Sequence, residues 1–538
     1  MEKANVFSQE STLFKVGKYV IGLVLVIGIF LRFYNLDGKI YWRDEVFTSL
    51  QVSGHLLDVA DYSKLFTGEL VSQADIAEYQ YANSSTSYAD TVNGLKEFEP
   101  QLTPFYFVLA RGWNSLLGDS TFINRLLTAL ISLSCLPFVY WLCLQLFEKS
   151  AVGWVTTAFV AVSPFQILYA QEARPYSLWV LTTLISSVLL LRAQKQATAK
   201  NWILYFVSVV ASLYTFLFAI TTLFAHGLYI LLSERDKISR VMLMFVASAL
   251  ASLVAFSPWL LVIINDPPSN YAAVPHGSLL SYPKGWLRNL SLSFADFGIN
   301  DASSKVALLA FLGYLLLLVA TIVYSYIYLQ RFATNKTFWF LACLLVVPFL
   351  MLLAYDFGKG GQLTTRGSYL IPSLLSLQIT FGYLMTSQCL QMKRFWILAC
   401  LFFLSVSTVS SFVLVSSNTW WHKADENIHH EVAAIINQAA SPLVISDVEF
   451  SLPISLSHSL TADTQFILLP PPDADAGWQL PEIPDGDFSD IFLYRPSELL
   501  QTELGQAAGV ELETLIEQAD NYCNCTPQVL VKVSTTSS

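Results

Sequence analysis

Residues 152–193 read VGWVTTAFVAVSPFQILYAQEARPYSLWVLTTLISSVLLLRA, two long apolar runs separated by a short polar loop. Each run, 152–170 and 176–193, has the length of a helix that crosses a bilayer. The loop between them, 171–175, therefore joins two spanning helices and carries charged side chains at the membrane edge. Ionisable groups there are costly unless they face a cavity or a partner, so they are candidates for function.

The whole chain has the composition of a polytopic α-helical membrane protein. Of its 538 residues, 54% are hydrophobic and only 13% are charged, whereas a soluble domain has about 25% charged residues. We predict about eleven transmembrane helices, at 17–35, 122–147, 152–170, 176–193, 201–214, 216–232, 240–264, 304–330, 337–355, 367–389 and 394–416. The first run follows basic residues, as a signal peptide would, but it is too long and has no small-residue cleavage site before Arg32. It is predicted to be a retained helix.

Basic residues predict the orientation of these helices. Under this helix count one face receives Lys15 and Lys18, Lys149, Arg192 with Lys195 and Lys200, Arg235 with Lys237 and Arg240, Arg331 with Lys336, and Lys393 with Arg394. Loops rich in Lys and Arg stay in the cytoplasm. The prediction is a multi-pass protein of the inner (plasma) membrane with a cytoplasmic N-terminus. The loops 36–121, 171–175, 265–303 and 356–366 and the C-terminal segment are then extracytoplasmic.

One apolar stretch, Leu102 to Leu117, receives a different interpretation. It has about sixteen residues and contains Arg111, and the charge pattern downstream would invert if it crossed the membrane. We therefore expect a juxtamembrane helix that lies on the outer surface and closes the first loop. A short spanning helix is the alternative.

Charge divides the chain into two predicted domains, a transmembrane domain at 1–420 and an acidic extracytoplasmic domain at 421–538. The net charge is −10, yet the second domain has 18 Asp and Glu against 3 Lys and Arg. Helical patterns at 427–440 and 497–508 and short strand-like runs at 443–445, 466–469, 491–494 and 529–533 predict a soluble α/β domain. No basic patch with interleaved aromatic residues is present, which excludes nucleic acid as a partner.

Asp44 and Glu45 are the first candidates for chemistry, because they follow the first apolar run by about ten residues. An acid at the outer lip of a membrane cavity can deprotonate a hydroxyl group. On a helix the two side chains point about 100° apart, so we expect one of them to face the cavity. Arg43 beside them can keep the acid ionised or bind a phosphate. The alternative is a solvated helix start, where the helix dipole favours acids.

Glu172 and Arg174 are the second candidates, with Tyr176 directly after them. Arg366 and Tyr369 begin a later spanning helix on the same predicted face. The guanidinium group presents a planar fork of donors that suits a phosphate, so outward-facing arginines predict a lipid-phosphate site. A Glu–Arg pair that holds a loop, or arginines that snorkel to the interface as anchors, are the alternatives.

Metal and cofactor motifs are not indicated. No phosphate loop, dinucleotide fingerprint or zinc motif is present, and Cys523 and Cys525 lack further zinc ligands nearby. We interpret His226, inside an apolar run, as a hydrogen-bonded core residue. His422, His429 and His430 are interpreted as a solvated helix face.

A family resemblance follows from the order of these segments. The Asp-Glu pair in the first outer loop precedes Thr103-Pro104-Phe105-Tyr106-Phe107-Val108-Leu109, Leu117-Gly118-Asp119-Ser120, Arg125-Leu126-Leu127, Ser163-Pro164-Phe165 and Tyr169-Ala170-Gln171-Glu172-Ala173-Arg174-Pro175-Tyr176-Ser177-Leu178. The chain resembles the membrane glycosyltransferases of the GT-C fold. It is most similar to the bacterial branch related to the protein O-mannosyltransferases and aminoarabinose transferase (glycosyltransferase family 39-like), over roughly residues 18–420.

The resemblance implies roles for individual residues. Asp44 is the first-loop catalytic acid that acts as general base, and Glu45 is the second choice. Glu172 and Arg174 map onto the second outer loop that completes the site, and Arg366, Ser368, Tyr369 and Pro372 resemble the family's late Arg-Tyr-x-x-Pro region. The chain departs from the family at Thr215-Phe216, where many members have a Thr-His pair.

The expected function is transfer of a sugar from a polyprenyl-phosphate donor in the bilayer to an extracytoplasmic hydroxyl of a glycan, lipid or protein acceptor. An inverting hexosyl or pentosyl transfer needs one base, and a phosphate leaving group needs no general acid, so no cofactor and no metal are required. Two alternatives remain open, a lipid-linked glycan transporter or flippase and a non-catalytic membrane scaffold. A transporter would usually show internal repeats and helices broken near the membrane midplane, and the sequence shows no repeat.

Overall fold

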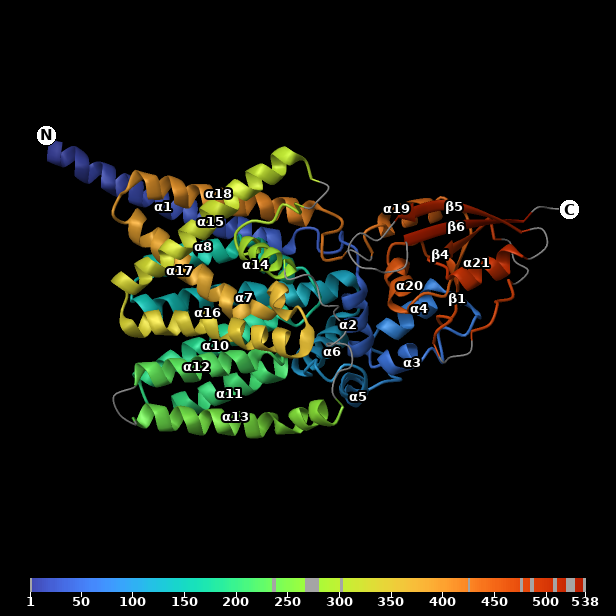
Figure 1. Ribbon diagram of the computed structural model, residues 1–538, viewed down its shortest axis with the longest axis horizontal. Coiled ribbons are helices and arrows are strands. Elements are labelled where there is room, and N and C mark those ends of the chain that lie inside the picture. Colours follow the sequence, from blue (N-terminus) through green and yellow to red (C-terminus); the bar gives the residue numbers. More distant parts are fainter. Residues whose placement is uncertain are drawn as a thin grey trace. The chain divides into compact units, whose positions relative to one another are not determined.

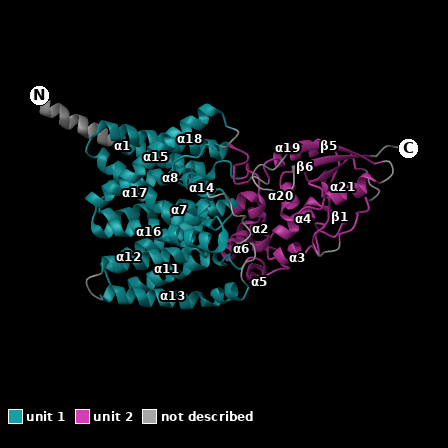
Figure 2. Cartoon of the chain, viewed as in Figure 1, with its two compact units in different colours: residues 1–36, 100–106, 125–416 teal, residues 37–99, 107–124, 417–538 magenta. Residues whose placement is uncertain are grey.

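The structure, a computed structural model, describes residues 2–234, 239–266, 280–299, 303–423, 426–474, 478–483, 488–506, 510–518 and 528–535, with only the helical backbone given for 2–16. Arg235, Lys237, Cys523 and Cys525, singled out in the sequence, lie outside these residues. The chain forms two compact units (Figure 2). Unit 1 comprises 1–36, 100–106 and 125–416, and unit 2 comprises 37–99, 107–124 and 417–538.

Unit 1 is a bundle of long apolar helices (Figure 1). Its helices are α1 (Glu2–Phe33), α7 (Thr121–Phe147), α8 (Ser150–Ala161), α9 (Pro164–Ala170), α10 (Tyr176–Lys195), α11 (Ala199–Thr215), α12 (Ala219–Ser233), α13 (Arg240–Asn265), α14 (Ser281–Leu292), α15 (Lys305–Phe332), α16 (Asn335–Tyr355), η2 (Asp356–Gly360), η3 (Leu363–Thr365), η4 (Gly367–Leu370), α17 (Ile371–Cys389) and α18 (Arg394–Ser416). Each predicted span coincides with helix. Among the described residues, seven helices are long and apolar enough to cross a membrane, or eight if α8 and α9 form one bent span.

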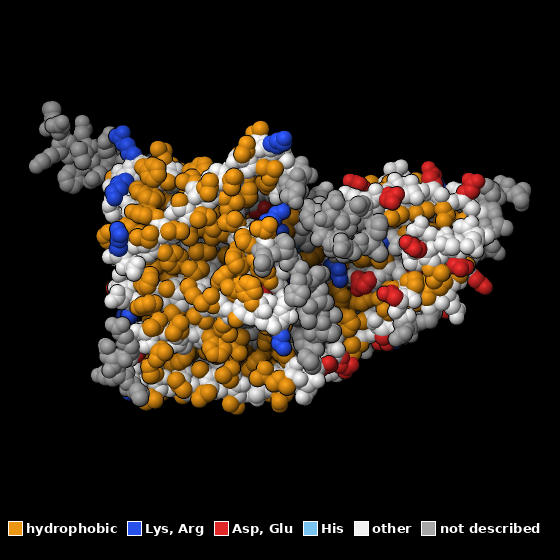
Figure 3. All heavy atoms as spheres, viewed as in Figure 1, with side chains coloured by type: hydrophobic (Ala, Val, Ile, Leu, Met, Phe, Trp, Pro, Cys, Tyr) orange, Lys and Arg blue, Asp and Glu red, His pale blue; other side chains and the backbone are white. Residues whose placement is uncertain are grey.

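Burial separates inner from outer helices in unit 1. In the apolar window of 367–389, which contains α17, 94% of the residues are buried, against 22% in α13 and in α15. Hydrophobic side chains cover most of the surface of unit 1 visible in Figure 3. In water such a surface would be strongly unfavourable, whereas in a bilayer it faces lipid tails. The predicted class, a polytopic helical membrane protein, is confirmed.

The predicted span 152–170 is broken rather than continuous. Its two halves, α8 and α9, meet at an angle of 60°, because Pro164 begins α9 and cannot donate to the preceding turn. Arg32, fully buried, donates to Ala161 O at 2.6 Å and Val160 O at 3.4 Å. Gly28 lets α1 approach, since a Cβ there would lie 2.5 Å from Ala161 O. A buried guanidinium group thus satisfies carbonyls that the break releases.

Helix ends that carry the predicted cytoplasmic charges meet at one end of unit 1. Lys195, the last residue of α10, pairs with Glu148 after α7 at 3.0 Å, and Lys336 in α16 pairs with Glu234 after α12 at 3.2 Å. Lys and Arg side chains gather along the left edge of unit 1 in Figure 3. These contacts agree with the predicted order of crossings, and the side of the membrane stays a prediction.

Reporter fusions test that side. An extracytoplasmic-only reporter fused at residue 420 or at the C-terminus should be active, because both follow an odd number of crossings from a cytoplasmic N-terminus. The same reporter fused at Lys195 should be silent, although the protein is expressed. A stable C-terminal fusion without activity would contradict both the count of eleven and the shared face of Asp44 and Glu172.

Unit 2 is built on one mixed sheet with the strand order β1-β3-β2-β4-β6-β5. The strands are β1 (Leu70–Ser72), β2 (Pro442–Ser446), β3 (Gln465–Leu468), β4 (Asp490–Tyr494), β5 (Val510–Gln518) and β6 (Gln528–Thr535). Strand β2 pairs in parallel with β3 and β4, and the other pairs are antiparallel. The four predicted strands are confirmed as β2, β3, β4 and β6. The helices are α2 (Arg43–Ser53), α3 (Leu56–Ala60), α4 (Gln73–Gln80), α5 (Tyr88–Phe98), α6 (Phe105–Leu117), α19 (His429–Ile436), α20 (Ser451–Ser457) and α21 (Glu498–Gly505).

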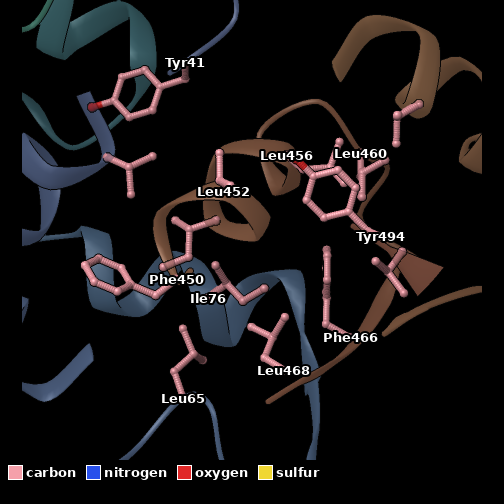
Figure 4. Packing of buried hydrophobic residues seen from close by; sticks show 14 of the residues in the cluster. Tyr41, Leu65, Ile76, Phe450, Leu452, Leu456, Leu460, Phe466, Leu468 and Tyr494 are labelled. Carbon is pink, nitrogen blue, oxygen red and sulfur yellow. The ribbon is translucent and has the colours of Figure 1, made fainter. Parts of the chain in front are cut away.

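The first outer loop belongs to the same compact body as the C-terminal segment. It supplies strand β1, which pairs antiparallel with β3. Apolar residues of both segments share one buried cluster, in which Tyr41, Leu65 and Ile76 join Phe466 and Leu468 (Figure 4). The domain boundary predicted at 420/421 therefore does not separate two compact bodies, since unit 2 draws on 37–99 and 107–124 as well. Its value as a functional division stays a prediction.

The stretch predicted to lie on the membrane surface forms α6, most of which belongs to unit 2. By length and composition α6 is not among the helices able to span. Its Arg111 is buried and donates to Val52 O at 2.9 Å and Ser53 O at 2.8 Å. These are the last two carbonyl groups of α2, so Arg111 connects α6 to the C-terminal end of that helix. Contact of α6 with a membrane stays a prediction.

The histidine interpretations have mixed outcomes. His226 is a hydrogen-bonded core residue, as predicted, with Ser187 Oγ and Tyr205 OH each 3.2 Å from its ring nitrogens. The prediction of a solvated helix face is wrong for His429. This residue is fully buried between Tyr494 OH at 2.6 Å and Ser455 Oγ at 3.3 Å. The acidic composition around it suggested an exposed helix, but this face of α19 packs on the sheet.

Burial, with a smaller contribution from the charge of Arg495, lowers the pKa of His429 from 6.5 to about 3. Between these values the unfolded chain binds a proton that the folded unit does not, so stability should fall as the pH drops below about 6.5. We expect the melting temperature of the purified protein to fall less between pH 7 and 4.5 in His429→Gln than in the wild type. Gln438→Ala, at an exposed position just after α19, removes no titratable group, so it serves as control and should keep the wild-type slope. Equal slopes for all three proteins would show that His429 does not couple folding to protonation.

Candidate functional site

Asp44 and Glu45 lie in the first turn of α2 in unit 2. The helix begins at Arg43 after Trp42, whose backbone is extended. Acids are favoured there by the helix dipole. The two carboxylates differ in environment, as the helical spacing predicts: Asp44 is half-exposed, whereas Glu45 is fully buried. Of these two carboxylates, only that of Asp44 therefore reaches the surface of unit 2.

Glu45 has a structural partner that accounts for its burial. Its Oε2 lies 3.4 Å from Nζ of Lys423, and both side chains are 0% exposed. Lys423 also donates to Ile40 O at 2.9 Å, and its Nζ lies 5.8 Å from the centre of the Trp42 ring. A buried ion pair with further hydrogen bonds holds its members in place. Of the two acids, Asp44 thus keeps the more accessible carboxylate, and its role as general base stays a prediction.

A further buried acid, Glu426 of the C-terminal segment, holds the start of α2. The Arg43 backbone N–H donates to Glu426 Oε1 at 2.8 Å, and Glu426 is fully buried. Thr48 Oγ1 donates to Asp44 O at 2.9 Å. Sequence reasoning missed Lys423 and Glu426, because nothing local links them to residues nearly four hundred positions away. The one available signal was that Lys423 is one of 3 basic residues in 421–538.

In unit 1, the loop 171–175 is buried and tightly held. Gln171 donates to Leu31 O at 2.9 Å and Tyr34 O at 2.8 Å. Glu172 is 1% exposed and Arg174 is 7% exposed, and the Arg174 N–H donates to Glu172 O at 2.7 Å within the turn. The burial of Arg174 contradicts the alternative of an interfacial snorkelling anchor, which would reach solvent.

An aromatic cluster, defined as Tyr169, Tyr176, Phe216, Phe218 and Tyr369, connects this loop to the start of α17. Its ring centres are 4.7 Å apart for Tyr169 and Tyr176, 5.7 Å for Tyr176 and Phe216, 5.9 Å for Phe216 and Tyr369, and 5.0 Å for Phe218 and Tyr369. Phe216, where the sequence resemblance implies His in many relatives, places an aromatic ring at the centre of this cluster.

Both candidate arginines flank the aromatic cluster. Arg174 Cζ lies 5.9 Å from the centre of the Tyr176 ring, and Arg366 Cζ lies 5.8 Å from that of Tyr369. Arg366 also donates to Tyr369 OH at 3.4 Å. Guanidinium groups at aromatic rings gain cation–π stabilisation, and their planar set of donors suits an anion. The structure thus brings together Glu172, Arg174, Tyr176, Arg366 and Tyr369.

The segment before Arg366 is braced by a buried acid that sequence reasoning missed. Asp356, 1% exposed, accepts from Leu363 N at 2.7 Å, Thr364 N at 2.9 Å and Thr364 Oγ1 at 2.7 Å. Asn289 of α14 donates to Thr364 O at 3.1 Å. A carboxylate that accepts several backbone N–H bonds fixes an irregular segment. The position of Arg366 therefore depends on Asp356. In the sequence, the only sign of this role was that Asp356 is an acid at the end of an apolar run.

The described part of the chain contains no group of three or more His, Cys, Asp and Glu side chains that converge as metal ligands. The expectation that the reaction needs no metal stays a prediction.

Solved structures of another protein have the same fold. ArnT from Cupriavidus metallidurans in the apo state matches with a TM-score of 0.52 and 12% identity, over 96% of this chain and 98% of ArnT. ArnT bound to undecaprenyl phosphate matches with a TM-score of 0.50 and 12% identity, over 95% of this chain and 97% of ArnT. At this identity the likeness concerns the fold, and it defines the class: the chain is a membrane protein with the GT-C fold.

Within this class, residues 100–262 match the family described as dolichyl-phosphate-mannose-protein mannosyltransferase. The resemblance stated from the sequence is confirmed as a similarity of this segment to that family and of the chain to the GT-C fold. No curated protein matches its sequence.

Proposed function

We propose that the protein transfers a sugar from a polyprenyl-phosphate donor to a hydroxyl group on an extracytoplasmic acceptor. The observation that carries this proposal is the pair of arginines at the aromatic cluster of unit 1, in a fold that ArnT shares. ArnT was crystallised bound to undecaprenyl phosphate. Arg174 and Arg366 present guanidinium groups suited to a lipid phosphate of that kind.

In the proposed reaction, Asp44 accepts the proton of the acceptor hydroxyl as its oxygen attacks the anomeric carbon. The bond from that carbon to the phosphate oxygen breaks, and the polyprenyl phosphate leaves with inversion at the anomeric carbon. The negative charge that develops on the phosphate is met by Arg174, with Arg366 in support. The rings of Tyr176 and Tyr369 hold both arginines, so little reorganisation accompanies the charge transfer.

The proposal includes the predicted location, the inner membrane with Asp44 and loop 171–175 on its extracytoplasmic side. Lipid-linked donors and acceptors outside the cytoplasm meet there. The sugar and the acceptor are left open, because no side chain in the aromatic cluster selects among sugar hydroxyls by charge.

Transfer assays test the proposed function. Purified protein in nanodiscs, supplied with polyprenyl-phosphate sugars and a membrane acceptor extract, should release polyprenyl phosphate in equal amount to the glycosylated product. A transporter would instead move the donor between leaflets of a liposome and release no polyprenyl phosphate. Failure to bind undecaprenyl phosphate, with no release from any donor tested, would contradict the proposal.

A further inference from the structure

A second polar site lies in unit 1, in a hollow between α7 and α10. Its volume is ≈ 170 Å³, and it is lined by Trp141, Gln145, Arg192, Lys195 and Gln196. Trp141 and Gln145 are one helical turn apart on α7, and Arg192 is one turn from Lys195 on α10, so each pair shares a face of its helix. The hollow lies near the C-terminal ends of both helices, and its two basic residues are in the last turn of α10.

The lining presents donors and no acid. Arg192 and Lys195 are cationic, and the amides of Gln145 and Gln196 add neutral donors. Arg192 is half-buried, and no described residue forms an ion pair or a side-chain hydrogen bond with it. Lys195 pairs with Glu148 at 3.0 Å, but that acid is 76% exposed and stands outside the lining. Such a hollow favours an anion.

The surroundings favour an anion that belongs to a lipid. Leu144, next to Gln145 on α7, is 38% exposed, and Trp154 of α8 is 48% exposed. Exposed apolar side chains on helices of this kind face acyl chains, and Trp is enriched where they meet the headgroups. Basic pockets between helices at this depth bind the phosphate groups of anionic lipids.

We propose that this hollow binds the phosphate headgroup of an anionic membrane lipid. The planar guanidinium group of Arg192 donates hydrogen bonds to the phosphate, and Lys195 adds a second positive charge. The Trp141 ring packs against one side of the headgroup. The acyl chains lie along Leu144. The site is separate from the candidate site at loop 171–175, since that loop precedes α10 and the hollow lies at the other end of this helix. It does not depend on the proposed transfer reaction.

Native mass spectrometry tests the lipid site. Full-length protein released from nanodiscs of equal parts phosphatidylglycerol and phosphatidylcholine should retain phosphatidylglycerol preferentially. Arg192→Gln with Lys195→Gln should lower that preference on the order of tenfold. A matched control, Lys149→Gln with Lys336→Gln, removes two charges outside the lining and should keep the wild-type preference. Arg192→Gln alone, which leaves the Lys195–Glu148 pair intact, should give an intermediate loss even if the double variant folds poorly.

Three outcomes would overturn the inference. Equal loss in the control variant would mean that general surface charge attracts the lipid. An unchanged preference in both hollow variants would mean that the lipid binds elsewhere. Thermal stabilisation by inorganic phosphate in detergent, equal to that by phosphatidylglycerol and lost in Arg192→Gln, would assign the hollow to a free anion instead of a lipid.

Discussion

Asp44→Asn should lower sugar transfer on the order of a hundredfold or more, the usual range for removal of a general base. Asparagine has nearly the shape of aspartate, and Asp44 is half-exposed at the start of α2, so unit 2 should stay folded. Donor binding should also survive, because the proposed phosphate ligands lie on unit 1. The measurement is polyprenyl phosphate released per enzyme at saturating donor, together with donor affinity and melting temperature.

Glu45→Gln tests the role of the acid next to Asp44. It removes the carboxylate that pairs with buried Lys423, and loss of one partner of a buried ion pair typically costs about 3–5 kcal/mol. We expect a lower melting temperature with transfer activity per folded molecule close to wild type. Glu45→Gln with Lys423→Met should recover part of the stability. Activity retained in Asp44→Asn but lost in a well-folded Glu45→Gln would exchange the two roles.

Arg174→Ala should weaken use of the donor by roughly ten- to a hundredfold, the value of a charge-assisted hydrogen bond to phosphate. Arg174→Lys should lose less, because it keeps the charge but lacks the planar fork. The side chain is 7% exposed in a loop held by Gln171, so its position is defined. The measurement is KM for the donor and affinity for undecaprenyl phosphate, with the melting temperature recorded for each variant.

Two comparisons separate phosphate binding from loop support. Arg366→Ala should also weaken donor use, but less, since Arg366 is exposed. Arg240→Ala removes an exposed cation at the start of α13 that is not part of the aromatic cluster, and it should leave the donor KM unchanged. If Glu172→Gln with Arg174→Gln keeps full activity and donor affinity, the pair is neither a phosphate site nor an essential brace.

Most of the helices of unit 1 and four of the six strands were predictable, because their signals are local. An apolar run of about twenty residues predicts a spanning helix wherever it occurs. Alternation and β-branched residues predicted β2, β3, β4 and β6 in the same way. Strand β1 has 3 residues and exists only through its pairing with β3, so no local pattern could predict it. The break between α8 and α9 had one local sign, Pro164, but its stabilisation by Arg32 is a contact between distant segments.

The sequence by itself determined the membrane class, the helical segments and the residue types of the candidate site, since these depend on composition and short spacing. Tertiary structure alone decided which groups share an environment. It separated Asp44 from Glu45 by burying the second against Lys423, and it placed Arg174 and Arg366 at one aromatic cluster. It also joined the first outer loop to the C-terminal sheet. The physical reason is that burial and ion pairing depend on contacts between segments hundreds of residues apart, which local patterns do not specify.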